Sequence, residues 1–236
     1  MEISVIIPTH NPESGRLRRT LAGLRAQTLS AERWETVLVD NASTPAVEFT
    51  LFTADAPNNL RLVREPELGL TAARRRGFTE AHGEIFVLVD DDNVLAPDYL
   101  ERVLALFAAH PRVGALGGKS VPEFAAQPPA WAHEFFHLLA VRDLGEASLI
   151  SSGLRPIDSA QNAYPTCAPI GAGMALRRTA VRVWLDALTD DPRRNAFDRR
   201  GSELVSSGDN DLVLTVMAAG WEVAYFPQLS LIHIIP

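Results

Sequence analysis

The chain has 236 residues, 47% of them hydrophobic, which is enough to bury a substantial core as one α/β domain. Its 22 Lys and Arg residues against 29 Asp and Glu residues give a net charge of -7, which argues against a general nucleic-acid-binding surface. The single cysteine, Cys167, excludes an internal disulfide bond and fits a reducing cytoplasm. The start of the chain lacks the pattern of a signal peptide, and no apolar run reaches the roughly 18 residues that span a bilayer.

The first half of the chain alternates strand and helix patterns. Short apolar or β-branched runs predict buried strands at residues 3–8, 34–40, 60–64 and 84–89. Apolar residues at helical spacing predict helices at residues 15–27 and 97–109, and a third helix begins after Gly69. This order of strands and helices builds a parallel sheet that binds its ligands beyond the carboxyl ends of the strands.

The second half of the chain is less regular. We expect strands or extended segments at residues 113–118, 171–178, 222–227 and 229–235. Helical patterns lie at residues 178–188 and 212–219, with a polar loop at residues 190–207 between them. Residues 122–169 show no clean period, so they are either a partly helical segment that covers a site or an ordinary surface insertion.

Three consecutive carboxylates, Asp90, Asp91 and Asp92, follow the predicted strand at residues 84–89. Like charges this close raise one another's pKa unless a cation lies between them. Hard carboxylate oxygens suit Mg²⁺ or Mn²⁺ better than Zn²⁺. The pattern therefore indicates a divalent cation site, with a solvated acidic turn before the next helix as the alternative.

Three arginines, Arg74, Arg75 and Arg76, lie in the first turns of the helix that begins after Gly69. Positive side chains near a helix N-terminus oppose the helix dipole, so this placement is costly unless an anion binds there. A bound phosphate would remove the conflict, and a solvated arginine face is the alternative.

In their order and spacing, these stretches resemble the glycosyltransferases of family 2, which have the GT-A fold. The matching stretches are residues 5–11, 37–41, 69–77, 90–92, 171–173, 208–209 and 227–233. The resemblance implies an α/β fold of the GT-A type, with a Rossmann-like, mostly parallel central sheet flanked by helices and a less regular acceptor-side C-terminal half. It also implies one domain over residues 1–236, with a nucleotide-sugar-binding half (1–118) and an acceptor-binding half (119–236). The family often continues past this point, which fits a domain truncated at the C-terminus.

The same resemblance implies the reaction and its partners. A sugar would move, with inversion, from a nucleotide-diphosphate-sugar donor to a hydroxyl acceptor, with UDP the expected nucleotide and Mn²⁺ or Mg²⁺ the expected cofactor. The acceptor would be a glycan, a lipid-linked molecule or a small molecule, and residues 122–169 would select it. A lipid acceptor would be compatible with peripheral association at the inner face of the membrane of a cytoplasmic protein.

The resemblance also assigns the donor and metal sites. It places Thr9 and Asp40 against the base of the nucleotide and Arg74 near its diphosphate. Asp92 would hold the metal, and His233 would approach the metal or the diphosphate. In the Asp90–Asp92 run, one of the other two aspartates would face the ribose or support the metal's ligand shell. The remaining expected donor contacts are Pro8, Asn11, Asp90 and Asp91.

The expected catalytic base is Asp209, which matches the aspartate of the family's Glu-Asp pair. A base is needed because an acceptor hydroxyl is a poor nucleophile near pH 7. The preceding residue is Gly208 instead of glutamate, so Asp211 stays a competitor, and a helix cap is the alternative role for either aspartate.

Gly208 also leaves open a second function, that of a catalytically degraded regulatory module that binds a nucleotide-sugar without transferring it. Two further classes fit less well. A phospho-acceptor signalling domain would be much shorter and would leave the arginine helix unexplained. A dinucleotide dehydrogenase would carry a GxGxxG motif after its first strand, which is missing here.

Overall fold

The polypeptide is organised around β1 (Ile3–Thr9), a strand with all of its residues buried. It pairs in parallel with β2 (Trp34–Asn41) on one side and with β4 (Ile85–Leu88) on the other. β3 (Leu60–Glu65) extends this parallel part beyond β2. The carboxyl ends of these strands therefore lie at one edge of the sheet, where ligands of open α/β sheets bind.

The second part of the sheet is mixed. β8 (Ala175–Arg177) pairs antiparallel with β4 and with β6 (Val113–Phe124), and β9 (Glu222–Ile235) pairs in parallel with β6. Two short strands, β5 (Asn93–Leu95) and β7 (Leu149–Ser152), pair antiparallel with β9. The strand order is β3-β2-β1-β4-β8-β6-β9-β5, with β7 beside β9 outside this path.

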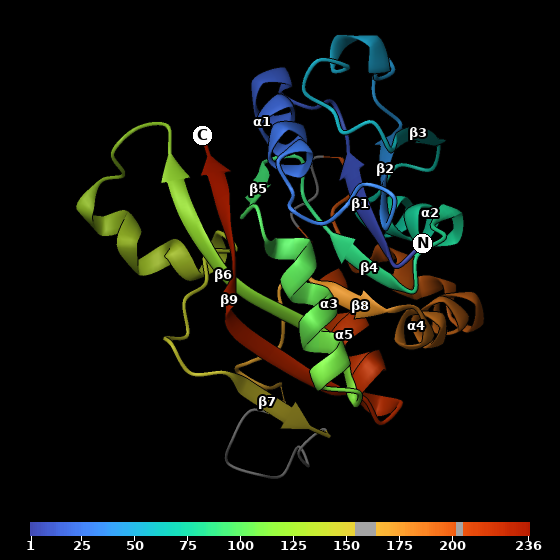
Figure 1. Cartoon of the computed structure of the whole chain (residues 1–236), viewed down its shortest axis with the longest axis vertical. Coiled ribbons are helices and arrows are strands. Elements are labelled where there is room, and N and C mark those ends of the chain that lie inside the picture. Colours follow the sequence, from blue (N-terminus) through green and yellow to red (C-terminus); the bar gives the residue numbers. More distant parts are fainter. Residues whose placement is uncertain (154–163, 202–204) are drawn as a thin grey trace.

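The computed structural model (Figure 1) describes residues 1–153, 164–201 and 205–236. The predicted segment at residues 122–169 is therefore described only in part, and its residues 154–163 lie outside the described residues, as do residues 202–204 of the predicted polar loop. In the part that is described, no helix is long and apolar enough to cross a membrane.

Helices cover both faces of the sheet. On one face lie α1 (Ser14–Arg25) and α3 (Tyr99–Ala109), which share an apolar cluster with the residues of β1 whose buried side chains point to this face (Figure 1). The other face carries α2 (Leu70–Glu80), α4 (Arg178–Asp190) and α5 (Gly208–Ala218), which share a second cluster. Side chains alternate between the faces of a strand, so β1 contributes to both clusters and reads as a continuous apolar run.

Three short 3-10 helices complete the described elements. They are η1 (Phe49–Leu51), η2 (Ala130–Leu138) and η3 (Pro192–Ala196). η2 falls in the segment for which the sequence predicts partial helix, and η3 falls in the predicted polar loop.

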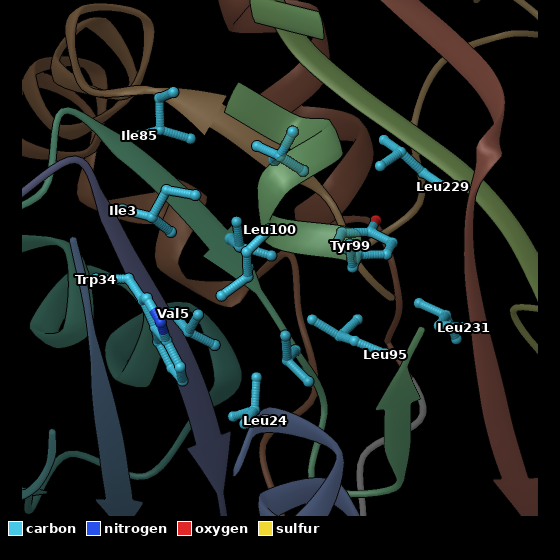
Figure 2. Close-up of a cluster of buried hydrophobic side chains, with 14 of the residues drawn as sticks. Ile3, Val5, Leu24, Trp34, Ile85, Leu95, Tyr99, Leu100, Leu229 and Leu231 are labelled. Atoms are coloured by element: carbon cyan, nitrogen blue, oxygen red, sulfur yellow. The ribbon is translucent and has the colours of Figure 1, made fainter. Parts of the chain in front are cut away.

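The cluster on the α1–α3 face joins the two parts of the sheet. Figure 2 shows Tyr99 and Leu100 of α3 between Ile3 of β1 and Leu231 of β9. Tyr99 is 1% exposed, and its hydroxyl donates a hydrogen bond of 2.5 Å to the carbonyl of Gly173. This buried contact ties α3 to the turn that precedes β8, which borders the carboxyl edge of the sheet.

The predicted parallel core is confirmed, and the differences are the short strand β5 and several elements of the second half. The glycine-rich strand continues from residue 118 to residue 124, while the strand predicted at residues 171–178 is confined to β8. The last two extended segments form one strand, β9, which continues through Pro227. β5 and β7 were not predicted, because three or four residues are too few to show a period.

At the opposite edge of the sheet, a buried carboxylate connects the amino ends of the strands by hydrogen bonds. Glu35 of β2 is 6% exposed and accepts hydrogen bonds from Ser4 Oγ (2.7 Å), the His82 amide (2.7 Å) and Arg61 Nε (3.1 Å). Burial raises the pKa of a carboxyl group, but these hydrogen bonds outweigh it and lower the pKa of Glu35 to about 2.

We expect Glu35→Gln to lower the free energy of unfolding by about 2 kcal/mol at pH 7. Because the folded-state pKa is depressed, this stabilisation is present above the unfolded-state value near 4.5 and is lost as the pH falls toward 2. Urea unfolding followed by tryptophan fluorescence at pH 7, 5 and 3.5 measures it. Glu32→Gln, at an exposed position before β2, is the control. A loss of unfolding free energy equal to that of the control, or one that does not become smaller as the pH falls, would contradict this role of Glu35.

Candidate active site

A cavity of about 580 Å³ opens at the carboxyl edge of the parallel strands. β1, β2 and β4 lie side by side in parallel register, so the residues that follow them meet there. α2 and α5 begin at the same edge, and β9 ends there. Of the residues that the sequence predicts for the site, those that line the cavity are Pro8, Thr9, Arg74, Asp90, Asp91, Asp92, Asp209 and His233.

The three consecutive aspartates form an acidic wall of this cavity. Asp91 accepts a hydrogen bond from the Thr9 hydroxyl at the end of β1. Burial, followed by repulsion from the neighbouring carboxylates, raises the pKa of Asp90 to about 7, although Arg74 opposes the shift. Burial likewise raises the pKa of Asp91 to about 6. Burial and repulsion therefore both disfavour the ionised form of Asp90 and Asp91 in the absence of a bound cation.

β5 brings His233 to the acidic wall. Asn93 of β5 pairs with His233 of β9, and the Ile234 amide donates to the carbonyl of Asp92 (2.9 Å). As a result, His233 Nε2 lies 3.6 Å from Asp92 Oδ2. Burial favours the neutral imidazole, but Asp92 outweighs it and raises the pKa of His233 above its usual value. The two residues thus lie together although 141 positions separate them in the chain (233 minus 92), and their roles toward a metal stay predictions.

On the other side of the cavity lies a buried cluster of one arginine and two carboxylates. Arg74, in the first turns of α2, is 3% exposed. Its Nη1 lies 2.9 Å from Asp198 Oδ2 and 2.5 Å from Asp209 Oδ1. Burial lowers the pKa of a guanidinium, but the two carboxylates outweigh it and raise the pKa of Arg74. Carboxylates of the chain therefore provide the anions that the sequence pattern required near Arg74.

The other two arginines of α2 are also paired within the protein. Arg75 Nη2 lies 2.8 Å from Glu67 Oε2, and Arg76 Nη2 lies 2.9 Å from Glu80 Oε1. Neither residue lines the cavity. Of the three arginines, Arg74 is thus the one placed to meet a ligand there.

At the start of α5, the structure distinguishes Asp209 from Asp211, the two candidates that the sequence left for the catalytic base. Asp209 lines the cavity, and its Oδ2 accepts a hydrogen bond of 2.7 Å from the Gly171 amide. A Cβ at Gly171 would lie 2.6 Å from that oxygen, so glycine permits this close approach. Asp211 does not line the cavity, because its carboxylate accepts from Trp184 Nε1 (2.8 Å) and Arg194 Nε (2.9 Å). Asp211 therefore holds α4 and η3 against α5.

Two predicted donor residues, Asp40 and Asn11, are outside the cavity lining. Asp40 is 2% exposed and accepts from the Ser43 amide (3.1 Å) and Arg64 Nη1 (2.7 Å). Asn11 Oδ1 accepts from the Thr44 amide (2.8 Å). Both residues order the loop that follows β2, and their contacts with a nucleotide base stay predictions.

Several lining residues were not singled out from the sequence. Asn41 at the end of β2 accepts a hydrogen bond of 2.8 Å from the Gly69 amide and so positions the start of α2. Asp198 lies in the predicted polar loop, where no periodic pattern marks it. The same holds for Leu138, Leu139 and Ala140, which belong to the unperiodic segment at residues 122–169 and form an apolar part of the wall. Their position agrees with the prediction that this segment covers a site.

Comparison with known proteins shows what this arrangement belongs to. The sequence model of Glycosyl transferase family 2 matches residues 4–184. The uncharacterized protein y4gI of Sinorhizobium fredii is 30% identical over 241 residues, which cover 98% of this chain and 24% of that protein. The uncharacterized glycosyltransferase alr2836 of Nostoc sp. is 26% identical over 207 residues, which cover 79% of this chain and 57% of that protein. The chain thus spans only part of the length of these relatives.

Among solved structures, the crystal structure of S. aureus TarS 1-349 in complex with UDP-GlcNAc has the same fold. It matches with a TM-score of 0.66 at 18% identity, over 100% of this chain and 59% of that chain. This likeness confirms the predicted α/β fold of the GT-A type, with a central sheet flanked by helices. Together with the family match over most of the sequence, it shows that the chain belongs to glycosyltransferase family 2.

Proposed function

We propose that the chain is an inverting glycosyltransferase that moves a sugar from a nucleotide-diphosphate-sugar, in particular a UDP-sugar, to a hydroxyl acceptor. The observation that carries the proposal is that an acidic wall and an arginine–carboxylate cluster face one cavity at the carboxyl edge of the sheet. Ligands of open α/β sheets bind at this edge. The binding of UDP-GlcNAc by the structural neighbour TarS supports the same class of donor here.

The cavity offers two positive features to a diphosphate. Arg74 supplies a guanidinium, which suits phosphate oxygens because of its planar set of donors. The amino end of α2 also lines the cavity at Gly69 and Leu70, and the positive end of a helix dipole favours an anion. We infer that the diphosphate lies on this side and the nucleoside lies toward Thr9 and Asn41.

The residues of the acidic wall fit a divalent cation. Asp92 supplies hard carboxylate oxygens, His233 supplies an imidazole beside them, and a cation would offset the burial and repulsion that raise the pKa of Asp90. Among the described residues, no group of three or more His, Cys, Asp or Glu side chains is arranged to hold a metal. Substrate phosphates and water would therefore complete the ligands of Mg²⁺ or Mn²⁺. When bound, the cation would neutralise charge that develops on the leaving diphosphate.

Asp209 is placed to act as the catalytic base. Its side chain is 33% exposed, and the Gly171 amide fixes one of its oxygens. We propose that this carboxylate takes the proton of the acceptor hydroxyl as the hydroxyl attacks the anomeric carbon. Attack from the face opposite the nucleotide breaks the bond between sugar and phosphate and inverts the anomeric configuration. The acceptor would be a glycan, a lipid-linked molecule or a small molecule, selected in part by the wall at Leu138–Ala140.

If Asp92 holds a metal ion, replacing Asp92 should reduce the thermal stabilisation that a bound ligand gives the protein. UDP with Mn²⁺ at about a hundred times its Kd is expected to raise the Tm of the wild type by about 5 °C, because a ligand that binds only the folded state stabilises it. Asp92→Asn should remove the Mn²⁺-dependent part of this shift. Asp186→Asn, at an exposed position of α4, should keep it. An unchanged Mn²⁺-dependent shift in Asp92→Asn would contradict the metal assignment.

For the base, we expect Asp209→Asn to slow hydrolysis of the UDP-sugar, with water as the acceptor, by about 100-fold or more. Donor binding, measured by calorimetry, should change by less than about threefold, because the base acts on the acceptor. Asp211→Asn is the comparison, and it should lower the Tm without a selective loss of kcat, since Asp211 holds Trp184 and Arg194. A wild type that binds the donor but never hydrolyses or transfers it would favour the regulatory binding module instead.

A further inference from the structure

We propose that Asp198, which lies beside Gly208, is a positioning residue that shares the charge of Arg74 with Asp209, so that the Asp209 carboxylate can act on the acceptor. This inference rests on the proposed function, because it assigns a second carboxylate to the same base site. It concerns a residue of the polar loop after η3, a segment that the sequence marks with no motif.

The first observation is that Asp198 and Gly208 share one space. A Cβ built on Gly208 would lie 2.2 Å from Asp198 Oδ2 and 2.7 Å from its Cγ, far inside van der Waals contact. The φ angle of Gly208 is not in the left-handed region, so backbone conformation does not demand glycine at this position. Glycine is needed because the Asp198 carboxylate occupies the volume in which a side chain at position 208 would begin.

The second observation is the division of exposure between the two carboxylates on Arg74. Asp198 is 4% exposed, and its Oδ2 accepts a hydrogen bond of 2.9 Å from Arg74 Nη1, while its Oδ1 accepts from the Arg199 amide (3.0 Å). The Asp209 side chain is 33% exposed and faces the cavity. Both carboxylates border the cavity, but Asp198 is almost fully buried, so the more exposed Asp209 is the carboxylate that an acceptor can reach.

These contacts predict what the loss of Asp198 would do. A buried guanidinium must be balanced by negative charge, so without Asp198 the Asp209 carboxylate alone would balance the positive charge of Arg74. An aspartate held more tightly by a cation is a weaker base, because the cation favours its ionised form. The guanidinium would also lose one of its two anchors, and small displacements of a catalytic group are costly in rate.

The test uses kinetics of UDP-sugar hydrolysis with Mn²⁺ for the full chain. We expect Asp198→Asn and Asp198→Ala to lower kcat by about 10- to 100-fold while the KM for the donor changes by less than about threefold. Asp190→Asn, at an exposed carboxylate at the end of α4, is the matched control and should leave both constants unchanged. Circular dichroism and Tm show whether each variant is folded.

A relocation experiment separates positioning from space filling. Because a Cβ at position 208 would also lie 2.9 Å from the Cβ of Asp198, the background is Asp198→Gly, in which Gly208→Glu returns a carboxylate to the same volume from the neighbouring backbone. We expect this double variant to recover kcat at least tenfold over Asp198→Gly alone, whereas Asp198→Gly with Gly208→Gln, which returns volume without charge, should not. Gly208→Glu alone should impair the protein, since it overlaps Asp198.

The possible results separate the positioning role of Asp198 from the proposed function. Equal recovery by Glu and Gln, or no loss of kcat in Asp198→Asn and Asp198→Ala while the wild type is active, would overturn the positioning role and leave the proposed function intact. A wild type that binds the donor but neither hydrolyses nor transfers it would overturn the proposed function, and the positioning role with it.

Discussion

The site depends on one buried positive charge. Arg74 is almost fully removed from solvent, and a guanidinium in that position is tolerated only when anions balance it. Its two partners are Asp198 and Asp209, the first of them 124 positions away in the sequence. The ion cluster therefore joins three separate parts of the chain, α2, the loop after η3 and the start of α5, at the edge where the parallel strands end. Because these contacts fix the elements relative to one another, they also shape the cavity.

The two sides of the cavity offer different groups. One side has the Arg74 guanidinium, which Asp198 and Asp209 balance, and the amino end of α2, whereas the other side has the Asp90–Asp92 run. Burial, and after it repulsion between the carboxylates, raises the pKa of Asp90 and Asp91, and a bound cation would offset both effects. A diphosphate accompanied by a divalent cation matches both sides at once. The proposed donor is highly anionic, and a divalent cation bound with it would reduce its repulsion from a protein of net charge -7.

Similar residues can have different tasks because a helix turns them apart. Asp209 and Asp211 are two positions apart at the start of α5, and at 3.6 residues per turn they differ by about 200° around the helix axis. One consequently faces the cavity and the other faces Trp184 of α4. The strand ends show a comparable division. Asn41 lines the cavity, whereas Asp40, the residue before it, is buried against the loop that follows β2.

Much of the fold was readable from the sequence because its signals are local. Buried parallel strands need continuous apolar runs, and amphipathic helices need apolar residues at helical spacing, so the first half of the chain was predicted with its parallel order. The resemblance to the family, and not a local signal, predicted Thr9, Asp92 and Asp209 at one site. β5 was missed because three residues carry no period. The continuous strand β9 was predicted as two segments because Pro227 suggested a break.

What the sequence alone determined is the family, the parallel core and a set of charged residues at the ends of strands and helices. Only the tertiary structure decided which of those charges meet. It paired Arg74 with Asp198 and Asp209, turned Asp211 away from the cavity, and showed that Gly208 is small because a carboxylate from another loop fills the space beside it. The reason is physical: a propensity belongs to a short stretch of chain, whereas the balance of a buried charge depends on atoms that are brought together only by folding.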